Sequence, residues 1–407
     1  MTAPLPADAA SASAAAPRRA IGIDVGGTRT KIGLVAADGS LGIPYSLPTP
    51  ADPRELCAML ARETSSLRER AGLPAKTPIG AVVPGILDEE RELVELAVNL
   101  GWKDLSLGAM LREHLTAPLA LGHDVRAGGM AEAAWGAGRL LPQSTPPDGG
   151  DLPPLADLLF VPIGTGIAAA VVHGGSVFGD RFTGEIGQLQ VTEPYTGAPV
   201  RLEEVAAASA IGRRYAQQID QEDSALATTD GGRPAARAVV DLARAGDPGA
   251  ERILFSALDT LGQALATIVS SVGSLPVVIG GGLAEGGSIV LDTLRDSIVA
   301  RLGMMPAPPV LPSSLGMWAG CQGAGLLGLT RATDAGPTGD AGRSGPTDAG
   351  PAGTPGPTGS TAAPGSVGSP GPVGLPGSAE APGSAEAPGP TGSAGPAPPR
   401  ISAEARS

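Results

Sequence analysis

AIGIDVGGTRTKIGLV, residues 20–35, is the stretch of this chain that decides its fold class. Two apolar runs flank a Gly-Gly-Thr turn, and this pattern predicts a β-hairpin. Gly26 and Gly27 let a bound group approach the backbone, and their N–H groups can line an anion-binding nest with the Thr28 hydroxyl. Asp24 is placed to hold Mg²⁺, directly or through water, because this cation prefers carboxylate and water oxygens. The stretch alone is equally compatible with an ordinary hairpin that has a glycine turn.

A second stretch repeats this pattern about 140 residues later. Apolar residues 158–163 lead into Gly164-Thr165-Gly166, and a further apolar run ends at Val172. Two similar hairpins facing one cleft are what an internally duplicated α/β protein would show. A helix predicted over 249–272 precedes a strand at 276–279 that enters Gly280-Gly281-Gly282. The apolar spacing also predicts helices over 52–71, 106–114 and 319–329 and from about Val125, and short strands at 78–85 and 119–121.

Composition excludes several classes of protein. The net charge of −13, without a basic cluster, predicts no nucleic-acid partner. Residues 1–18 lack a basic start followed by an apolar core, and no uninterrupted apolar run reaches transmembrane length, so we expect a cytoplasmic protein with no membrane partner. Cys57 and Cys321 lie far apart, which argues against a disulfide framework or a thiolate zinc site and favours two buried apolar residues.

The two ends of the chain are not globular in composition. Residues 333–407 consist almost wholly of Gly, Pro, Ser, Thr and Ala, and they cannot bury enough apolar surface to offset the entropy of ordering. We therefore expect a disordered tail there, and a disordered Ala- and Pro-rich segment at residues 1–18.

Several motifs in a fixed order resemble the ROK family of sugar kinases, within the actin-like ATPase and hexokinase fold group. Asp24 to Thr28 and Gly164 to Ile167 are similar to its two phosphate motifs, and Gly280 to Gly282 to its adenosine-side glycine run. The other matching segments are Asn99-Leu100-Gly101-Trp102, His123-Asp124, Gly184-Glu185-Ile186-Gly187 and Leu202-Glu203.

This resemblance implies an α/β fold of duplicated actin-like ATPase (ribonuclease H-like) domains with an interdomain cleft. The implied N-terminal domain spans 19–122 and takes back a C-terminal helix, 315–332. The implied C-terminal domain spans 123–314.

The resemblance also implies an ATP-dependent hexose kinase that transfers the γ-phosphoryl group to a sugar hydroxyl, glucose 6-OH being the first choice. ATP and Mg²⁺ are the implied cofactors, and Asp124 is the implied general base, since a nearby carboxylate can take the proton of the attacking hydroxyl. An Asp just before a helix is also a common N-cap, and it can serve both roles. The implied sugar contacts are Asn99, His123, Glu185, Gln188 and Glu203, and the implied ATP contacts are Asp24, Gly26, Gly27, Thr28, Gly164, Thr165, Gly166, Gly280, Gly281 and Gly282.

Some of these roles have alternatives. His123 can contact the sugar, support Asp124 or simply pack. Glu185 can be structural, and Glu203 can be part of a solvated helix start.

Three departures from the family pattern are visible. His123 stands where the family usually has Asn, and Gln188 stands where it has a His that in many members helps to bind zinc. Residues 192–200 contain none of the cysteines that complete that zinc site, so we predict no structural zinc and a loop held by packing and hydrogen bonds.

Alternatives to a glucokinase remain open. They are a kinase for another hexose or an N-acetylhexosamine, a polyphosphate-dependent glucokinase, and a sugar-sensing ROK protein without catalysis. About twenty residues precede the first phosphate motif, too few for the helix-turn-helix domain of ROK repressors. The resemblance also implies a homodimer.

Overall fold

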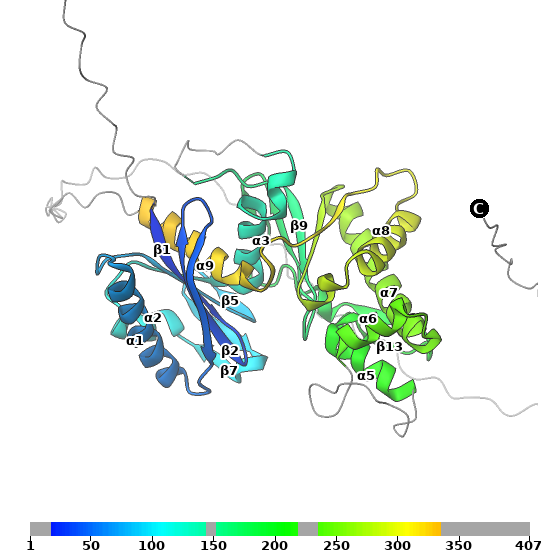
Figure 1. Ribbon diagram of the computed structural model, residues 1–407, viewed down its shortest axis with the longest axis horizontal. Coiled ribbons are helices and arrows are strands. Elements are labelled where there is room, and N and C mark those ends of the chain that lie inside the picture. The colour runs from blue at the N-terminus through cyan, green and yellow to red at the C-terminus, as the bar shows by residue number, and fades with distance from the viewer. Residues whose placement is uncertain (1–17, 144–151, 219–234, 335–407) are drawn as a thin grey trace, which may run out of the picture. The chain divides into compact units, whose positions relative to one another are not determined.

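The computed structural model describes residues 18–143, 152–218 and 235–334 of the chain (Figure 1). Nearly all of the two segments expected to be disordered lie outside these residues.

The first sheet has the strand order β3-β2-β1-β4-β8. Strands β1 and β2 form the predicted hairpin, in which Asp24 lies directly opposite Lys31. β1 runs parallel to β4, and β4 runs parallel to β8. The five strands are β1 (Arg19–Val25), β2 (Arg29–Ala36), β3 (Leu41–Pro48), β4 (Ile79–Val83) and β8 (Leu119–His123).

Side-chain alternation along β1 divides the two faces of this sheet. Ile21, Ile23 and Val25 pack with residues of α1 (Pro53–Ala71) and α2 (Leu107–His114). On the other face α9 (Ala319–Asp334) packs on β1, β4 and β8, and beside α3 (Asp124–Ala134) (Figure 1). The helix returns from the far end of the described chain, so the first sheet is covered by segments distant in sequence.

Glycine on the strands lets α9 approach the sheet closely. A Cβ atom at Gly80 would lie 1.7 Å from the Ala324 carbonyl oxygen, and one at Gly22 would lie 2.1 Å from the Cys321 carbonyl oxygen. A larger residue at either position would push the helix away from the sheet.

The second sheet repeats the topology of the first, with the order β11-β10-β9-β14-β15. β9 is antiparallel to β10 and parallel to β14, as β1 is to β2 and β4. The predicted duplication is therefore confirmed. The strands are β9 (Leu158–Pro162), β10 (Ala170–His173), β11 (Ser176–Val177), β14 (Val277–Gly280) and β15 (Val310–Pro312).

β10 begins later than the apolar run predicts. The carbonyl of Ile167 accepts a hydrogen bond from Gly187 N, and Ala169 N donates to the Gly184 carbonyl. Residues 167–169 therefore bond mainly to the 184–187 segment, apart from one isolated bridge between Ile163 and Ile167.

One buried core surrounds the second sheet and is built mainly from helices. α7, predicted from its apolar spacing, lies at its centre. Its most apolar 18-residue window is 61% buried, so this helix, long and apolar enough to cross a membrane, is packed as a core helix. Glu251, Arg252 and Asp259 interrupt its apolar residues. The helices are α4 (Leu202–Ala206), α5 (Ala208–Gln218), α6 (Ala236–Arg244), α7 (Pro248–Val272) and α8 (Ser288–Leu302).

Smaller elements lie between the strands and helices of the two halves and carry several motifs. Trp102 is buried in the first core, and Cys57 and Cys321 are free and buried, as predicted. The elements are β5 (Ile86–Asp88), β6 (Leu93–Ala97), β7 (Trp102–Leu105), β12 (Gln190–Thr192), β13 (Pro199–Arg201) and the 3₁₀ turns η1 (Val98–Leu100), η2 (Ala137–Leu140), η3 (Ile186–Gln188), η4 (Gly282–Gly286) and η5 (Gly316–Trp318).

Candidate active site

Asp24 lies at the end of β1 and is paired with a lysine. Lys31 Nζ is 2.8 Å from Asp24 Oδ2. The Asp24 residue is only 7% exposed, and burial raises the pKa of its carboxyl, with the nearby Asp124 carboxylate adding to the rise and Lys31 opposing it. A Cβ atom at Gly320 would lie 2.9 Å from Asp24 Cγ, so the first turn of α9 closes over this carboxyl.

The Gly26–Thr28 turn presents free backbone donors. Gly26 N donates to the Arg29 carbonyl, whereas Gly27 N and Thr28 N have no acceptor within the described part of the chain. Thr49, which sequence reasoning missed, fixes the turn. Its hydroxyl donates to the Gly26 carbonyl at 2.7 Å and its N–H to the Thr28 carbonyl at 3.0 Å. The turn therefore has the unpaired N–H groups that an anion requires.

Asn99, in the η1 turn between β6 and β7, abuts this turn. A Cβ atom at Gly27 would lie 3.1 Å from the Asn99 carbonyl oxygen and 3.2 Å from Asn99 Cβ. The predicted sugar segment and the first predicted phosphate turn are thus neighbours in space.

His123, not Asp124, is the N-cap of α3. His123 Nδ1 accepts hydrogen bonds from Val125 N at 3.2 Å and Arg126 N at 3.4 Å, and Asp124 is the first helical residue. The N-cap role considered for Asp124 is therefore wrong. The His123 ring also hydrogen-bonds the backbone of Gly85, so its polar atoms are taken by backbone groups. Burial, with a smaller effect of Arg126, lowers the pKa of His123 to about 4, and the ring is neutral at pH 7.

Asp124 interacts electrostatically with Asp24, and Lys31 acts on both carboxyls. Burial raises the pKa of its carboxyl, while the Val125 N–H and the Lys31 and Arg126 cations lower it. Asp124 Oδ1 accepts from Val125 N at 2.7 Å, which orients the side chain at the start of α3. A carboxyl held here with a raised pKa suits proton abstraction near neutral pH.

Two further charged residues line this end of α3, and no sequence motif pointed to them. Glu89 Oε1 accepts from His123 N at 3.1 Å and lies 3.4 Å from Arg126 Nε. Arg126 Nη1 donates to the Asp180 carbonyl at 3.0 Å. Arg126 therefore links the loop after β5 to the loop after β11.

The predicted sugar contacts on the second half of the chain form one polar group. Gln188 Nε2 donates to Glu203 Oε1 at 3.0 Å, and Arg201, also missed from the sequence, pairs with the same oxygen at 2.8 Å. Cβ atoms at Gly166 and Gly187 would lie 3.3 and 3.2 Å from Glu203 Oε2. Glu185 precedes η3 and acts electrostatically on His123, so it connects this group to the start of α3.

The second glycine turn lies against the Gly280–Gly282 run. Ile163 N donates to the Gly280 carbonyl at 2.9 Å, and Gly281 has a φ of 76°, which favours glycine. Ser209 Oγ and Ala208 N, at the start of α5, donate to the Thr165 and Gly164 carbonyls. Cβ atoms at Gly164 and Gly282 would meet nothing within 4 Å, so there is open space beside both.

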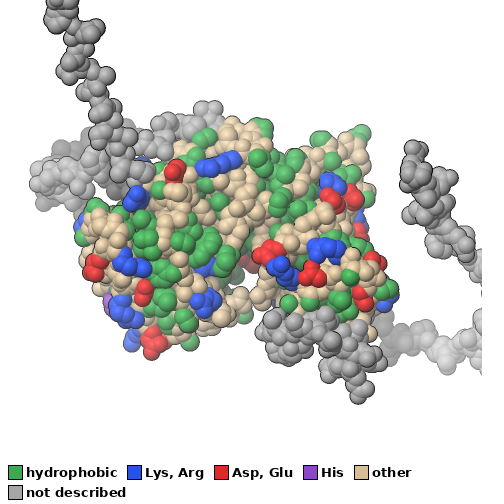
Figure 2. All heavy atoms as spheres, in the orientation of Figure 1, with side chains coloured by type: hydrophobic (Ala, Val, Ile, Leu, Met, Phe, Trp, Pro, Cys, Tyr) green, Lys and Arg blue, Asp and Glu red, His purple; other side chains and the backbone are tan. Residues whose placement is uncertain are grey.

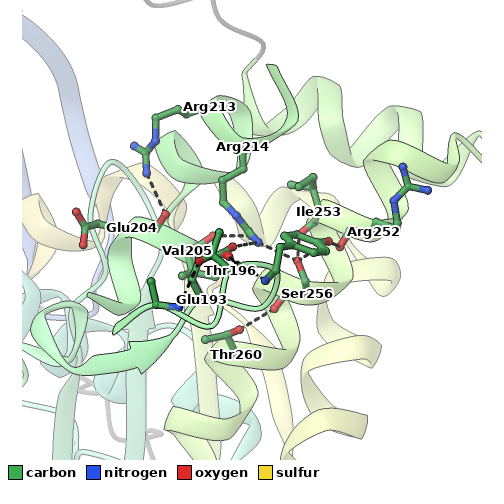
Figure 3. A network of polar contacts seen from close by, with 12 residues as sticks. Glu193, Thr196, Glu204, Val205, Arg213, Arg214, Arg252, Ile253, Ser256 and Thr260 are labelled. Atoms are coloured by element: carbon green, nitrogen blue, oxygen red, sulfur yellow. Dashed lines mark hydrogen bonds and ion pairs between the residues drawn. The ribbon is translucent and has the colours of Figure 1, made fainter. Parts of the chain in front are cut away.

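An ion-pair network holds the β12–β13 hairpin, in the segment that the sequence predicts to lack zinc ligands. Arg214, 7% exposed, pairs with Glu193 Oε1 at 3.0 Å, and Glu193 Oε2 accepts from Tyr195 N and Thr196 N. Figure 3 shows the Arg214 guanidinium reaching from α5 toward Glu193 and Ser256 of α7. Within the described residues no group of three or more His, Cys, Asp or Glu side chains is arranged to hold a metal.

A groove of about 670 Å³ lies elsewhere, between the β12–β13 hairpin and the C-terminal half of α7. Its lining includes Leu189, Val191, Pro199, Ile268 and Val272 and none of the predicted site residues.

Comparison with known proteins places the chain in a family. The model of the ROK family matches residues 20–331, so the chain belongs to the ROK family. The glucokinase of Thermotoga maritima is 29% identical over 290 residues, covering 69% of this chain and 86% of its own length. The crystal structure of the ROK hexokinase from Thermus thermophilus is 28% identical with a TM-score of 0.61, and the match covers 78% of this chain and 99% of that one. These relatives support a sugar kinase.

Two further relatives bear on the alternatives. The ROK glucokinase from Streptomyces griseus, solved with glucose and AMPPNP, is 24% identical with a TM-score of 0.62, covers 77% of this chain and 99% of its own, and shows the shared fold. The DNA-binding transcriptional repressor Mlc of Escherichia coli is 27% identical over 59% of this chain and 57% of its own length.

Proposed function

We propose that this protein is an ATP-dependent hexose kinase with glucose as its substrate and the 6-hydroxyl as the acceptor. The observation that carries the proposal is the arrangement at the ends of β1 and β8. Asp24, which is buried, and Asp124, whose side chain is 27% exposed, both feel the charge of Lys31 beside a glycine turn with unpaired N–H groups.

The chemistry requires one base and a site for the phosphates. Asp124 takes the proton of the sugar hydroxyl as that oxygen forms its bond to the γ-phosphorus, and the bond from the γ-phosphorus to the bridging oxygen breaks to release ADP. Phosphoryl transfer depends mainly on positioning and charge stabilisation, so the protein supplies no covalent intermediate.

The two glycine turns fit a polyphosphate chain. Gly26, Gly27 and Thr28 on one side, and Gly164, Thr165 and Gly166 on the other, would hold the phosphates, while Gly280, Gly281 and Gly282 would leave room for the nucleoside. Lys31 occupies Oδ2 of Asp24, and Oδ1 remains for Mg²⁺ or one of its waters. Bound Mg²⁺ would neutralise charge on the phosphates.

Asn99, Glu185, Gln188 and Glu203 are the proposed sugar contacts, because amides and carboxylates match hydroxyls that both donate and accept. His123 is assigned to positioning rather than to sugar contact, since backbone groups already bond its ring.

The localisation, oligomeric state and domain bounds that we propose accompany the same function. We propose a cytoplasmic homodimer without a nucleic-acid or membrane partner, with a first domain of 19–122 plus 315–332 and a second of 123–314. On the face drawn in Figure 2, acidic and basic side chains are interspersed.

The test is an ADP-release assay with ATP, Mg²⁺ and a panel of hexoses, run on the wild type, Asp124→Asn and Asp104→Asn. Asp104 is an exposed aspartate with a φ of 50°, which asparagine tolerates, so its variant controls for loss of one carboxylate. We expect glucose turnover that falls about 10²–10⁴-fold in Asp124→Asn alone. Sugar binding without turnover, with ATP or polyphosphate, would instead identify a sensor. Turnover unchanged in Asp124→Asn would reject the base.

A further inference from the structure

A short turn after β11, residues 180–183, contacts the small sheet formed by β5, β6 and β7. Arg181 makes this contact. Its Nε lies 3.1 Å from Glu95 Oε1 on β6, and its Nη1 lies 4.0 Å from Asp88 Oδ2 on β5. The turn and the sheet are distant in sequence, so this arginine joins two separate segments of the chain.

The backbone of the turn is held by its own residues. Asp180 Oδ1 accepts from Phe182 N at 3.0 Å, and Asp180 N donates to Thr183 Oγ1 at 2.9 Å. Gly184 follows with a φ of 101°, a value that favours glycine. The Phe182 ring lies 5.1 Å from Arg181 Cζ and supports the guanidinium by a cation–π contact. The turn therefore presents Arg181 in a defined direction.

Both partners of this ion pair lie just before a proposed sugar contact. Glu95 precedes Asn99 by four residues, and Arg181 precedes Glu185 by four residues. Asn99 belongs to the η1 turn that follows β6, and Glu185 directly precedes η3. The separation of Arg181 from Glu95 therefore governs the separation of the two sugar-binding segments.

A second arginine fixes the same turn beside the proposed base. Arg126 Nη1 donates to the Asp180 carbonyl at 3.0 Å, and Arg126 lies two residues after Asp124. The Arg126 side chain is 13% exposed, whereas that of Arg181 is 42% exposed. Arg181 is thus the accessible link, and its substitution leaves the hydrogen bond of Arg126 to the turn in place.

We propose that Arg181 is a positioning residue for the sugar, which holds the Asn99 and Glu185 segments at the separation that a hexose requires. The proposal rests on the hexose kinase function above. A site that is already arranged loses less free energy when it binds its ligand, so the ion pair with Glu95 strengthens sugar binding. The pair touches neither the phosphates nor Asp124, so nucleotide binding and the chemical step do not depend on it.

The experiment compares wild type, Arg181→Gln, Glu95→Gln, the double variant and Arg295→Gln. Arg295 of α8 pairs with Asp292 at 2.9 Å and its side chain is 47% exposed, so its variant is a matched control for loss of an exposed ion pair. Calorimetry measures binding of the panel of hexoses without nucleotide, and binding of AMPPNP with Mg²⁺ without sugar. Steady-state assays measure kcat and the KM for the sugar.

In Arg181→Gln we expect the hexose dissociation constant and the sugar KM to rise about fivefold, the upper range for a partly exposed ion pair, with kcat and AMPPNP affinity unchanged. Glu95→Gln should shift both constants in the same direction. The double variant should match Arg181→Gln, because the two substitutions remove one interaction. Arg295→Gln should match the wild type.

Ionic strength gives an independent measurement. A hexose carries no charge, so salt acts on its binding only through the protein. Raising NaCl from about 0.05 to about 0.5 M should weaken hexose binding to the wild type by screening the ion pair, and it should leave binding to Arg181→Gln unchanged.

An ion pair with no role in sugar binding gives different results. The hexose dissociation constant would then stay at the wild-type value in Arg181→Gln, even with a lower melting temperature, and this would overturn the proposal. Effects of the two single substitutions that multiply in the double variant would also overturn it. A wild type that binds a hexose without turnover would reject the kinase function, while the dissociation constants of the variants would still decide the role of Arg181. A wild type that binds no hexose would reject both.

Discussion

Replacing His123 with asparagine should remove a pH-dependent part of the protein's stability. His123 is 8% exposed, and its pKa falls from 6.5 to about 4 in the folded chain, mainly because burial disfavours the charged ring. Its Nδ1 accepts two backbone N–H bonds, which protonation would abolish. The unfolded chain therefore binds a proton between pH 6.5 and 4 that the folded chain excludes.

The sign and size of the effect follow from this difference. Because the folded pKa is depressed, the stabilisation is complete above pH 6.5 and is lost as the pH falls toward 4. Between pH 7.5 and 4.5 the lost stability amounts to about 2.5 kcal/mol. Asparagine does not titrate and is a favoured N-cap, so the variant keeps a bond to the start of α3 without this dependence.

The assay is urea unfolding of wild type and His123→Asn at a series of pH values. The free energy of unfolding of the wild type should fall by about 2.5 kcal/mol more than that of the variant over this interval. His114 and His173 are present in both proteins, so their contributions cancel in the difference. Parallel curves for the two proteins would refute the assignment of a buried neutral ring, as would an NMR titration of His123 near pH 6.5.

Three more predictions concern packing and ion pairs. Gly80→Ala should lower the free energy of unfolding by about 3 kcal/mol, because its Cβ atom would meet α9. Gly42→Ala is the control and should leave the free energy of unfolding unchanged, since its Cβ atom would have no contact closer than 3.7 Å. Equal effects of the two substitutions in urea unfolding would refute the close approach of α9 to the sheet. Glu132→Gln should also lower the free energy of unfolding by about 3 kcal/mol in the same assay, because it disturbs the hydrogen bonds of a buried carboxylate. That carboxylate accepts from Ala137 N, Ser313 Oγ, Ser314 N and Leu315 N. An unchanged midpoint of urea unfolding would show that these bonds are dispensable. Glu193→Ala should lower the free energy of unfolding by about 3 kcal/mol, because it leaves the buried Arg214 charge unpaired. Excess chelator should leave the melting temperature of the wild type unchanged. A fall in melting temperature on chelation would indicate a structural metal.

The sequence alone determined the local architecture. Alternating apolar residues and a Gly-Gly-Thr turn were sufficient to predict the β1–β2 hairpin, and its repeat at residues 158–172 was sufficient to predict a duplicated fold. The ends of α1 are also set by local residues, with Asp52 and Pro53 at its start and Gly72 just after its end. These features depend on interactions between residues that are close in sequence, so the amino-acid sequence is enough to predict them.

Only the tertiary structure decided how the charged groups are shared. That Glu89 accepts a hydrogen bond from His123 N, or that Glu132 joins α3 to residues 313–315, depends on segments that lie 34 to 183 positions apart. The capping role of His123 was also hidden, because its residue type rarely caps helices and burial was needed to keep the ring neutral. Burial and partners across sheets set these roles, and neither can be read from the local pattern of residues.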